Sequence, residues 1–351
     1  MSNTSSLGSA YVVSPKLLLQ FNVFMLCGLI AAFGSLFILL VIWKRKELHT
    51  KDFGLLAGLA GGDLAIGLGF FGIGLNSIIT VFQGTTLNTV TISSCLKRLY
   101  TPVLTFGTQC AILMTATIAI DRLLAVLVYK VYNHLGKSYT LMLVSAAYGI
   151  ALFSTTVGVG TGLHREAQGD MATDACITND AMSVGYMTFR MIFQIVIGVL
   201  AMVIYGGVVI VLRRRRKSTA SIDNSVSGAE LRRQKQVTKT CSVIVWCTAF
   251  MVTIPAIVQS VAAQGGSFGN FVFTTIVPFT SPLVPVNSGI NVFVYALKYK
   301  KFRDAMIKCC TAALDNENTT RVAAATSSVV PVKPSSKRVT ATDNLAATYN
   351  E

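Results

Sequence analysis

Two sets of charged residues stand inside segments that are otherwise apolar, and these are the first candidates for chemistry. Asp63 lies in the middle of one apolar segment, and Asp121-Arg122 lies near the C-terminal end of another. A carboxylate or guanidinium at the centre of a bilayer costs about 2.5–3.5 kcal/mol, so its presence indicates a function or a specific partner. Arg122 can pair with the adjacent Asp121 or donate to a docked partner, because a guanidinium at a membrane boundary reaches the interface.

A stripe of polar residues marks the last apolar segment. Asn287, Ser288, Asn291 and Tyr295 fall within an arc of roughly 100° if the segment is helical, and so share one face. Such a face can meet Asp63 and hold water or a monovalent cation, for which we expect sodium. The alternative is that these groups only form hydrogen bonds between neighbouring helices.

Residue types suited to catalysis or to metal binding are not arranged for either. The three histidines, His49, His134 and His164, all lie in predicted loops, and Asp63 has no second carboxylate in another apolar segment. Intramembrane hydrolases need paired aspartates, a serine with a base, or metal ligands. The eight cysteines form no CxxC pair. The sequence therefore predicts no catalytic residue and no metal site.

The segments that carry these residues are long enough to cross a bilayer. Only 13% of residues are charged and 52% are hydrophobic, whereas soluble domains are about a quarter charged. About twenty apolar residues span the hydrocarbon core, and seven segments reach that length. They cover about residues 17–43, 53–82, 96–127, 139–161, 182–212, 240–262 and 271–297. This predicts an all-α membrane protein with a bundle of seven transmembrane helices.

The basic residues predict how the segments are oriented. Lys and Arg cluster at the ends of apolar segments, as at Lys44–Lys46 and Arg213–Lys217. Basic residues accumulate on the cytoplasmic side, which predicts an N-terminus outside and a C-terminus inside. The net charge of +15 therefore reflects topology and not a nucleic-acid partner. We expect an extracellular segment over 1–16, a transmembrane domain over 17–309, a disordered tail over 310–351, and a multi-pass protein of the plasma membrane bilayer.

Five short motifs occur in order along these segments and together resemble one family. They are Leu59–Asp63 (LAGGD), Asp121-Arg122-Leu123, Pro255 in the sixth segment, Asn291–Tyr295 (NVFVY), and the basic Lys300–Arg303 that follows it. Their order and spacing resemble the rhodopsin-like (class A) G-protein-coupled receptors, over nearly the whole chain to Cys310. Lys300–Arg303 is similar to that family's short amphipathic eighth helix. Tyr205 stands where the family has a tyrosine low in the fifth helix.

Several positions depart from the family pattern. Leu123 replaces a tyrosine, Val292 replaces a proline, Thr253 replaces an aromatic residue and Ser35 replaces an asparagine; the fourth segment has no tryptophan. Such divergence resembles nematode serpentine chemoreceptors, most closely the SRSX class. The first three departures affect residues of the activation machinery, which leaves open whether the receptor couples to a G-protein.

The resemblance implies a receptor that binds an extracellular ligand and activates a heterotrimeric G-protein through a conformational change. Arg122 would leave Asp121 and turn toward Tyr205, Tyr295 and the G-protein, and arrestin-like proteins would bind the tail. A disulfide between Cys95 and Cys176 is also implied. Cys95 lies about two residues farther from Arg122 than is usual in the family, which implies an irregular helix or a shifted loop.

The ligand class follows partly by exclusion. Amine receptors of the family place an aspartate where this chain has Leu104, and opsins place a lysine where it has Pro285. The remaining polar side chains predict a pocket for a small chemosensory molecule or a peptide. Its candidate residues are Thr101, Leu104, Thr105, Gln194 and Gln259. Four acids of an outer loop (Glu166, Asp170, Asp174 and Asp180) favour a solvated loop over recognition of a cationic peptide.

Modification sites and one competing function complete the predictions. Asn3 begins an Asn-Thr-Ser sequon, which predicts glycosylation. Cys309 and Cys310 follow the basic segment and are candidates for palmitoylation. The alternative to a receptor is a transporter or channel with seven spans. Transporters usually show internal repeats and paired charges at the midplane, and this chain has neither.

Overall fold

The computed structural model describes residues 15–85, 88–128, 132, 134–176, 178–219, 226–263, 265–299, 301–309 and 311. By its internal contacts the chain divides into two units, Met1–Met306 and Ile307–Glu351. The first unit contains the helix bundle, and the fold below is that of this unit. Asn3 and Cys310, the predicted glycosylation site and one predicted palmitoylation site, lie outside the described residues.

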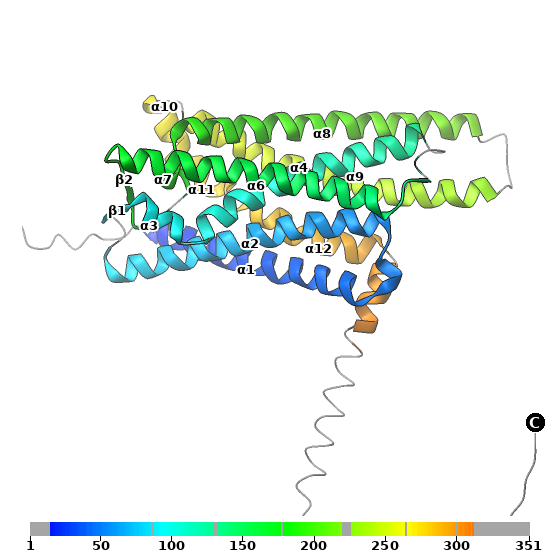
Figure 1. The fold of residues 1–351 in the computed structure, drawn as a ribbon, viewed down its shortest axis with the longest axis horizontal. Coiled ribbons are helices and arrows are strands. Elements are labelled where there is room, and N and C mark those ends of the chain that lie inside the picture. The colour runs from blue at the N-terminus through cyan, green and yellow to red at the C-terminus, as the bar shows by residue number, and fades with distance from the viewer. Residues whose placement is uncertain are drawn as a thin grey trace, which may run out of the picture. The chain divides into compact units, whose positions relative to one another are not determined.

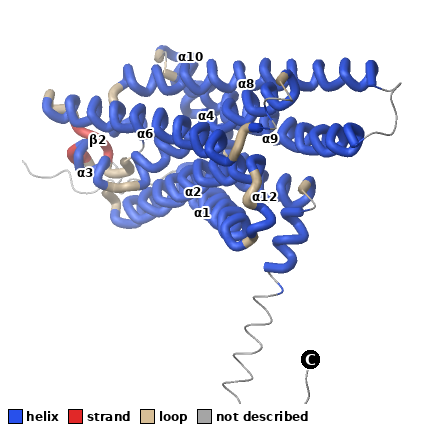
Figure 2. The backbone as a smooth tube through the Cα atoms, turned by 45° about the vertical axis from the view of Figure 1, so that its right-hand side comes forward, coloured by secondary structure: helices blue, strands red, loops and turns tan. Residues whose placement is uncertain are grey.

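Six helices of the described chain are long and apolar enough to cross a membrane. They are α1 (Pro15–Lys44), α2 (Lys51–Gln83), α4 (Tyr100–Leu127), α6 (Lys137–Ala167), α8 (Val184–Thr219) and α9 (Val226–Ala262). They run side by side in Figures 1 and 2. Their bounds extend beyond several predicted segments, because a helix continues past the hydrocarbon core wherever its backbone hydrogen bonds are not interrupted.

The seventh segment is helical but broken. It consists of α10 (Gly266–Phe271), a π-helical turn (Val272–Ile276), α11 (Val277–Thr280) and α12 (Leu283–Lys298). Pro278 and Pro282 lie at the starts of α11 and α12, where a residue without an N–H is tolerated. The segment brings α12 against α1, α2 and α9. The fold is therefore a seven-helix bundle whose last member is interrupted.

The third segment, expected over residues 96–127, is also interrupted, as the spacing of Cys95 from Arg122 implied. A short helix, α3 (Ile92–Lys97), ends at Arg98, whose backbone is extended, and α4 begins at Tyr100. Pro102 occupies the first turn of α4, where it breaks no hydrogen bond. Since Cys95 lies on α3, the interruption accounts for its unusual spacing from Arg122.

Two short strands lie beside α3 at one end of the bundle. β1 (Thr89–Thr91) pairs antiparallel with β2 (Met171–Thr173), with Val90 opposite Ala172. They are drawn red in Figure 2. Cys95 of α3 forms a disulfide with Cys176, which follows β2. We call this the disulfide end of the bundle; the opposite end, where α4 finishes, is called the Arg122 end.

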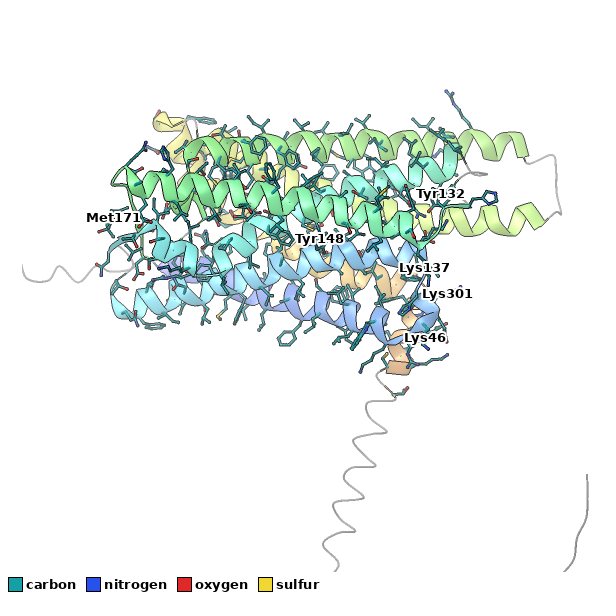
Figure 3. All side chains as sticks on the ribbon, viewed as in Figure 1. Lys46, Tyr132, Lys137, Tyr148, Met171 and Lys301 are labelled. Atoms are coloured by element: carbon teal, nitrogen blue, oxygen red, sulfur yellow. A yellow bond between two sulfur atoms is a disulfide. The ribbon has the colours of Figure 1, made fainter. Side chains whose placement is uncertain are left out.

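The bundle turns many apolar side chains outward. Apolar side chains project along the helices in Figure 3, and Phe82, Phe153 and Phe279 are each more than 70% exposed. In water such a surface would be unfavourable by about 25 cal/mol per Å². The buried set instead includes polar groups, among them Asp63, Asn287 and Asn291. Apolar groups outside and polar groups inside are typical of a protein that is surrounded by lipid.

Glycine sets the distance between α1 and α2. A Cβ atom added to Gly28 would overlap the backbone of Phe71, and one added to Gly67 would overlap the backbone of Ala32. Small residues let membrane helices pack backbone against backbone, where dispersion contacts replace the hydrophobic effect. This packing positions Asp63, which lies one turn before Gly67 on α2.

Residues 301–306, at the end of the first unit, are helical and follow α12 after a break at Tyr299. Phe302 is buried, and its ring centroid lies 6.3 Å from that of Tyr295. This is the segment expected to form the eighth helix. Its placement along a membrane surface stays a prediction. In the second unit, residues 307–309 are helical and Cys309 is partly exposed.

Candidate functional site

Arg122 is the centre of a buried ionic network at its end of the bundle. Its Nε lies 3.0 Å from Asp121 Oδ2, and its Nη2 also donates to that oxygen. The same Nη2 lies 2.6 Å from Asp52 Oδ1. The arginine side chain is only 7% exposed and that of Asp121 only 1%. The expected pairing of Arg122 with Asp121 is therefore present, together with a second carboxylate.

Tyr132, a helical residue that follows α4 in the chain, completes the network. Its hydroxyl lies 3.3 Å from both Asp121 Oδ2 and Arg122 Nη2. Lys51 Nζ donates to the Tyr132 carbonyl at 3.0 Å and lies 4.5 Å from the centre of its ring. Burial raises the pKa of the Tyr132 phenol above its ordinary value of about 10, so the hydroxyl is a neutral donor at physiological pH.

The charges within this network balance. Arg122 pairs with the carboxylates Asp121 and Asp52, and Lys51 binds the Tyr132 carbonyl, so two cations and two anions sum to zero charge. Pairing of buried charges offsets the cost of removing them from water, whereas one charge left alone would be strongly unfavourable. The sequence did not indicate Asp52 or Tyr132, because both stand in segments with no motif. Asp52 beside the basic Lys51 at the start of an apolar segment was the only available signal.

The two tyrosines expected to receive Arg122 are buried on two other helices of the bundle. Tyr205 lies on α8 with no exposed surface, and Tyr295 lies on α12 at 1% exposure. Tyr295 packs against Tyr299 and Phe302, with ring centroids 6.4 and 6.3 Å away. The movement of Arg122 toward either tyrosine stays a prediction.

Asp63 is joined to the polar stripe of α12, as the shared helical face suggested. Ser288 Oγ and Asn291 Nδ2 donate to its two carboxylate oxygens, each at 2.7 Å. Asn287 Nδ2 bonds instead to Thr248 Oγ1 of α9 at 3.3 Å. All four residues of the predicted polar core are therefore buried, and three of them form one cluster.

The cluster retains oxygen atoms suited to a cation. Asn291 Oδ1 is buried without a hydrogen-bond partner among the described residues, as is Asn287 Oδ1 one turn earlier on α12. Hard cations prefer carboxylate, carbonyl and hydroxyl oxygen. Asp63 with Ser288, Asn287 and Asn291 provides such oxygens, so the donor set fits a small cation, although both Asp63 oxygens already accept hydrogen bonds.

At the disulfide end a loop is bound firmly over the helices. Arg98 donates to the side chain of Asp174 at 2.6 Å and to its carbonyl at 2.7 Å. Asn76 of α2 donates to the same carbonyl at 3.2 Å and accepts from Arg98 at 2.9 Å. Cys176 adopts a positive φ of 49°, which is costly for a residue with a side chain. The disulfide and the ion pair together hold the loop against α2 and α3.

The predicted pocket residues have different roles in the structure. Thr101 Oγ1 donates to the Cys176 carbonyl at 3.3 Å, and Thr105 Oγ1 donates to the Thr101 carbonyl at 3.1 Å. Leu104 is buried against Gly69 of α2. Gln259 Nε2 lies 3.5 Å from Ser281 Oγ. Gln194 is buried on α8 and makes no hydrogen bond within the described residues.

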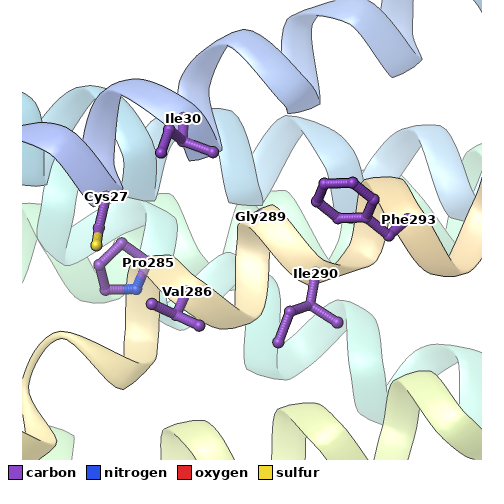
Figure 4. Close-up of a pocket in the computed structure, with 7 residues that line it drawn as sticks. All are labelled: Cys27, Ile30, Pro285, Val286, Gly289, Ile290 and Phe293. Carbon is purple, nitrogen blue, oxygen red and sulfur yellow. The ribbon is translucent and has the colours of Figure 1, made fainter.

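An apolar groove lies between α1 and α12, away from these residues. Figure 4 shows it lined by Cys27, Ile30, Pro285, Val286, Gly289, Ile290 and Phe293. No predicted pocket residue lines it, and its surface is almost entirely apolar. Its lining does not support specific recognition of a polar ligand.

Comparison with protein families agrees with this architecture. The profile of the family described as "7 transmembrane receptor (rhodopsin family)" matches residues 34–295. The chain belongs to this family and is a multi-pass membrane protein. A comparison with curated proteins finds no significant match. The narrower resemblance to the SRSX class stays a prediction.

Proposed function

We propose that this protein is a receptor of the plasma membrane that binds an extracellular ligand and activates a heterotrimeric G-protein. The ligand, a small chemosensory molecule or a peptide, binds at the disulfide end, and the G-protein docks at the Arg122 end. Membership of the rhodopsin family supports a receptor in general. The N-terminus then lies outside, in agreement with the basic residues at the Arg122 end.

The observation that carries the proposal is the closed network of Arg122. One guanidinium joins two carboxylates on two helices, and the hydroxyl of Tyr132 lies beside both Arg122 and Asp121. In this proposal the largely buried guanidinium has two states, one held by these carboxylates and one released from them. A switch needs such a bistable element, whose populations a ligand can shift by binding one state more tightly.

Activation in this proposal moves Arg122 from the held state to the released state. The guanidinium leaves Asp121 and Asp52, reaches toward Tyr205 and Tyr295, and donates to the C-terminal helix of the G-protein. Its planar set of donors remains charged throughout, so it needs an acceptor in each state. Arrestin-like proteins are proposed partners of the same end once the bundle has opened.

We also propose that a sodium ion binds beside Asp63. Asp63, Ser288, Asn287 and Asn291 would hold it, and the ion would neutralise the buried carboxylate. Because this cluster joins α2 to α12, occupancy would favour one arrangement of these two helices.

The test is a panel of G-protein biosensors in cells that express the full chain. Wild type, Arg122→Ala and Lys46→Ala would be compared under a broad ligand screen; Lys46 is an exposed cation at the same end. We expect a basal or evoked signal that Arg122→Ala changes at least several-fold and Lys46→Ala leaves within twofold. No signal from any G-protein, with normal surface expression, would contradict coupling.

A further inference from the structure

The inner face of α8 carries a buried positive charge near the disulfide end. Arg190 lies seven residues into the helix and is only 7% exposed, between the buried Met187 and Met191. Its Nε is buried without a hydrogen-bond partner. Within the described residues Arg190 forms no hydrogen bond and no ion pair, and its electrostatic neighbour is the phenol of Tyr186.

The carboxylates nearest to this end of the bundle are occupied elsewhere. Each of the four acids in the loop and helix end at residues 166–180 has a partner other than Arg190. The acids are Glu166, Asp170, Asp174 and Asp180, and their partners are, in order, Ser93, Arg165, Arg98 and Thr173. No described carboxylate therefore neutralises Arg190.

A guanidinium in this condition is strongly unfavourable. Arginine does not lose its proton in proteins, so burial cannot be relieved by neutralisation. An exposure of only 7% leaves little of the side chain in contact with water. Charged residues inside a membrane bundle mark functional positions because their cost requires a partner. The missing partner is an anion.

Two further donors lie on the same face of the helix. Tyr186, Arg190 and Gln194 are spaced four residues apart, so they stand one above another on adjacent turns. Tyr186 accepts a hydrogen bond from Gln109 Nε2 at 2.7 Å, and its own proton has no acceptor within the described residues. Gln194 is 7% exposed and also makes no hydrogen bond there. We call these three residues the donor ladder.

We propose that the donor ladder binds the anionic head group of an otherwise apolar ligand, with Arg190 as its charge partner. The head group is a carboxylate, sulfate or phosphate, since each presents two or more oxygens to the fork of a guanidinium. Met182, Met187 and Met191, all buried, provide a flexible apolar lining for the rest of the ligand. The inference rests on the proposed function in placing the ligand site at this end.

The test measures thermal unfolding of the purified full chain in nanodiscs, without a G-protein. The probes are octanoate, octyl sulfate and octyl phosphate, compared with octanol and octylamine of the same chain length. At least one anion is expected to raise the unfolding temperature of the wild type by about 2–4 °C more than octanol does. Arg190→Gln should abolish this increase. Lys97→Gln, which removes an exposed cation at the same end, should retain it.

A second measurement uses the same variants without any probe. Because its charge has no partner, Arg190→Gln should unfold at a temperature at least 2 °C above that of the wild type, again in the range of about 2–4 °C. A lower unfolding temperature would show that the fold itself pairs Arg190 and would overturn the proposal. Anions that stabilise no better than octanol, or that stabilise Arg190→Gln equally, would overturn it as well. None of these outcomes depends on G-protein coupling, which is tested separately with Arg122→Ala.

Discussion

Asp52 Oδ1 lies 2.6 Å from Arg122 Nη2, so the first turn of α2 is joined to the last turns of α4 by an ion pair across 70 residues of sequence. The side chains are 23% and 7% exposed. Because both side chains are largely buried, salt screens their attraction little. The pair therefore contributes more to stability than a surface salt bridge does. Within the proposed function it adds a second restraint to Arg122 beyond Asp121.

Replacing Asp52 by asparagine should raise basal signalling. The change removes one of the two carboxylates that hold Arg122, and about 1 kcal/mol of lost coupling shifts a two-state equilibrium about fivefold. We expect basal G-protein activity to rise several-fold at equal surface expression. Glu47→Gln removes an exposed acid of the same end and should leave it unchanged. Unaltered basal activity in Asp52→Asn would exclude a restraining role.

Tyr132→Phe should have a smaller effect in the same direction. It deletes two hydrogen bonds of 3.3 Å while keeping the ring that Lys51 Nζ covers. Each such bond contributes about 0.5–1.5 kcal/mol. The measurement is basal activity beside that of Asp52→Asn and of the double variant. If the increases in basal activity multiply in the double variant, the two restraints are independent. If the double variant has the same basal activity as Asp52→Asn, both residues act through one network.

Sodium should stabilise the wild type through Asp63. Exchanging sodium for potassium at constant ionic strength should lower the unfolding temperature of purified protein by a few degrees, because an ion bound only to the folded state stabilises it. Asp63→Asn should remove the difference between the two salts while retaining an acceptor for Ser288. Equal unfolding temperatures of the wild type in sodium and potassium would argue against the ion site.

The Arg98–Asp174 ion pair should stabilise the disulfide end more than the Arg165–Asp170 ion pair does. The Asp174 side chain is 14% exposed and that of Asp170 is 50% exposed, although both pairs join an arginine to a carboxylate within 2.9 Å. Double-mutant cycles on thermal unfolding should give a coupling of about 1 kcal/mol for the first pair and under about 0.5 kcal/mol for the second. Equal couplings would mean that burial does not distinguish them.

Gly67→Ala should impair folding although alanine is the better helix former. The new methyl group would overlap the backbone of Ala32, which cannot move away without separating α1 from α2. We expect a loss of surface expression and a lower unfolding temperature. Gly149→Ala is the matched control, because no atom lies within 4 Å of its added Cβ and the residue is exposed. That variant should be as stable as wild type or slightly more stable.

The sequence by itself determined the class of fold and the positions of the motif residues. Long apolar segments must form helices in a bilayer, because each backbone polar group needs a partner within its own segment. The face shared by Ser288 and Asn291 follows from helical periodicity, and both side chains do bond to Asp63. The pairing of Cys95 with Cys176 came from the family resemblance and is present.

The tertiary structure decided which polar groups have partners. Asp52 and Arg122 meet only because α2 and α4 pack with a particular offset along their axes and a particular rotation about them. A local sequence pattern specifies neither the offset nor the rotation. The same holds for Arg190, which the bundle buries without a carboxylate partner among the described residues. Periodicity specifies the face on which a side chain stands. Only the packing of helices specifies what that face meets, because contacts across a bundle join residues far apart in the chain.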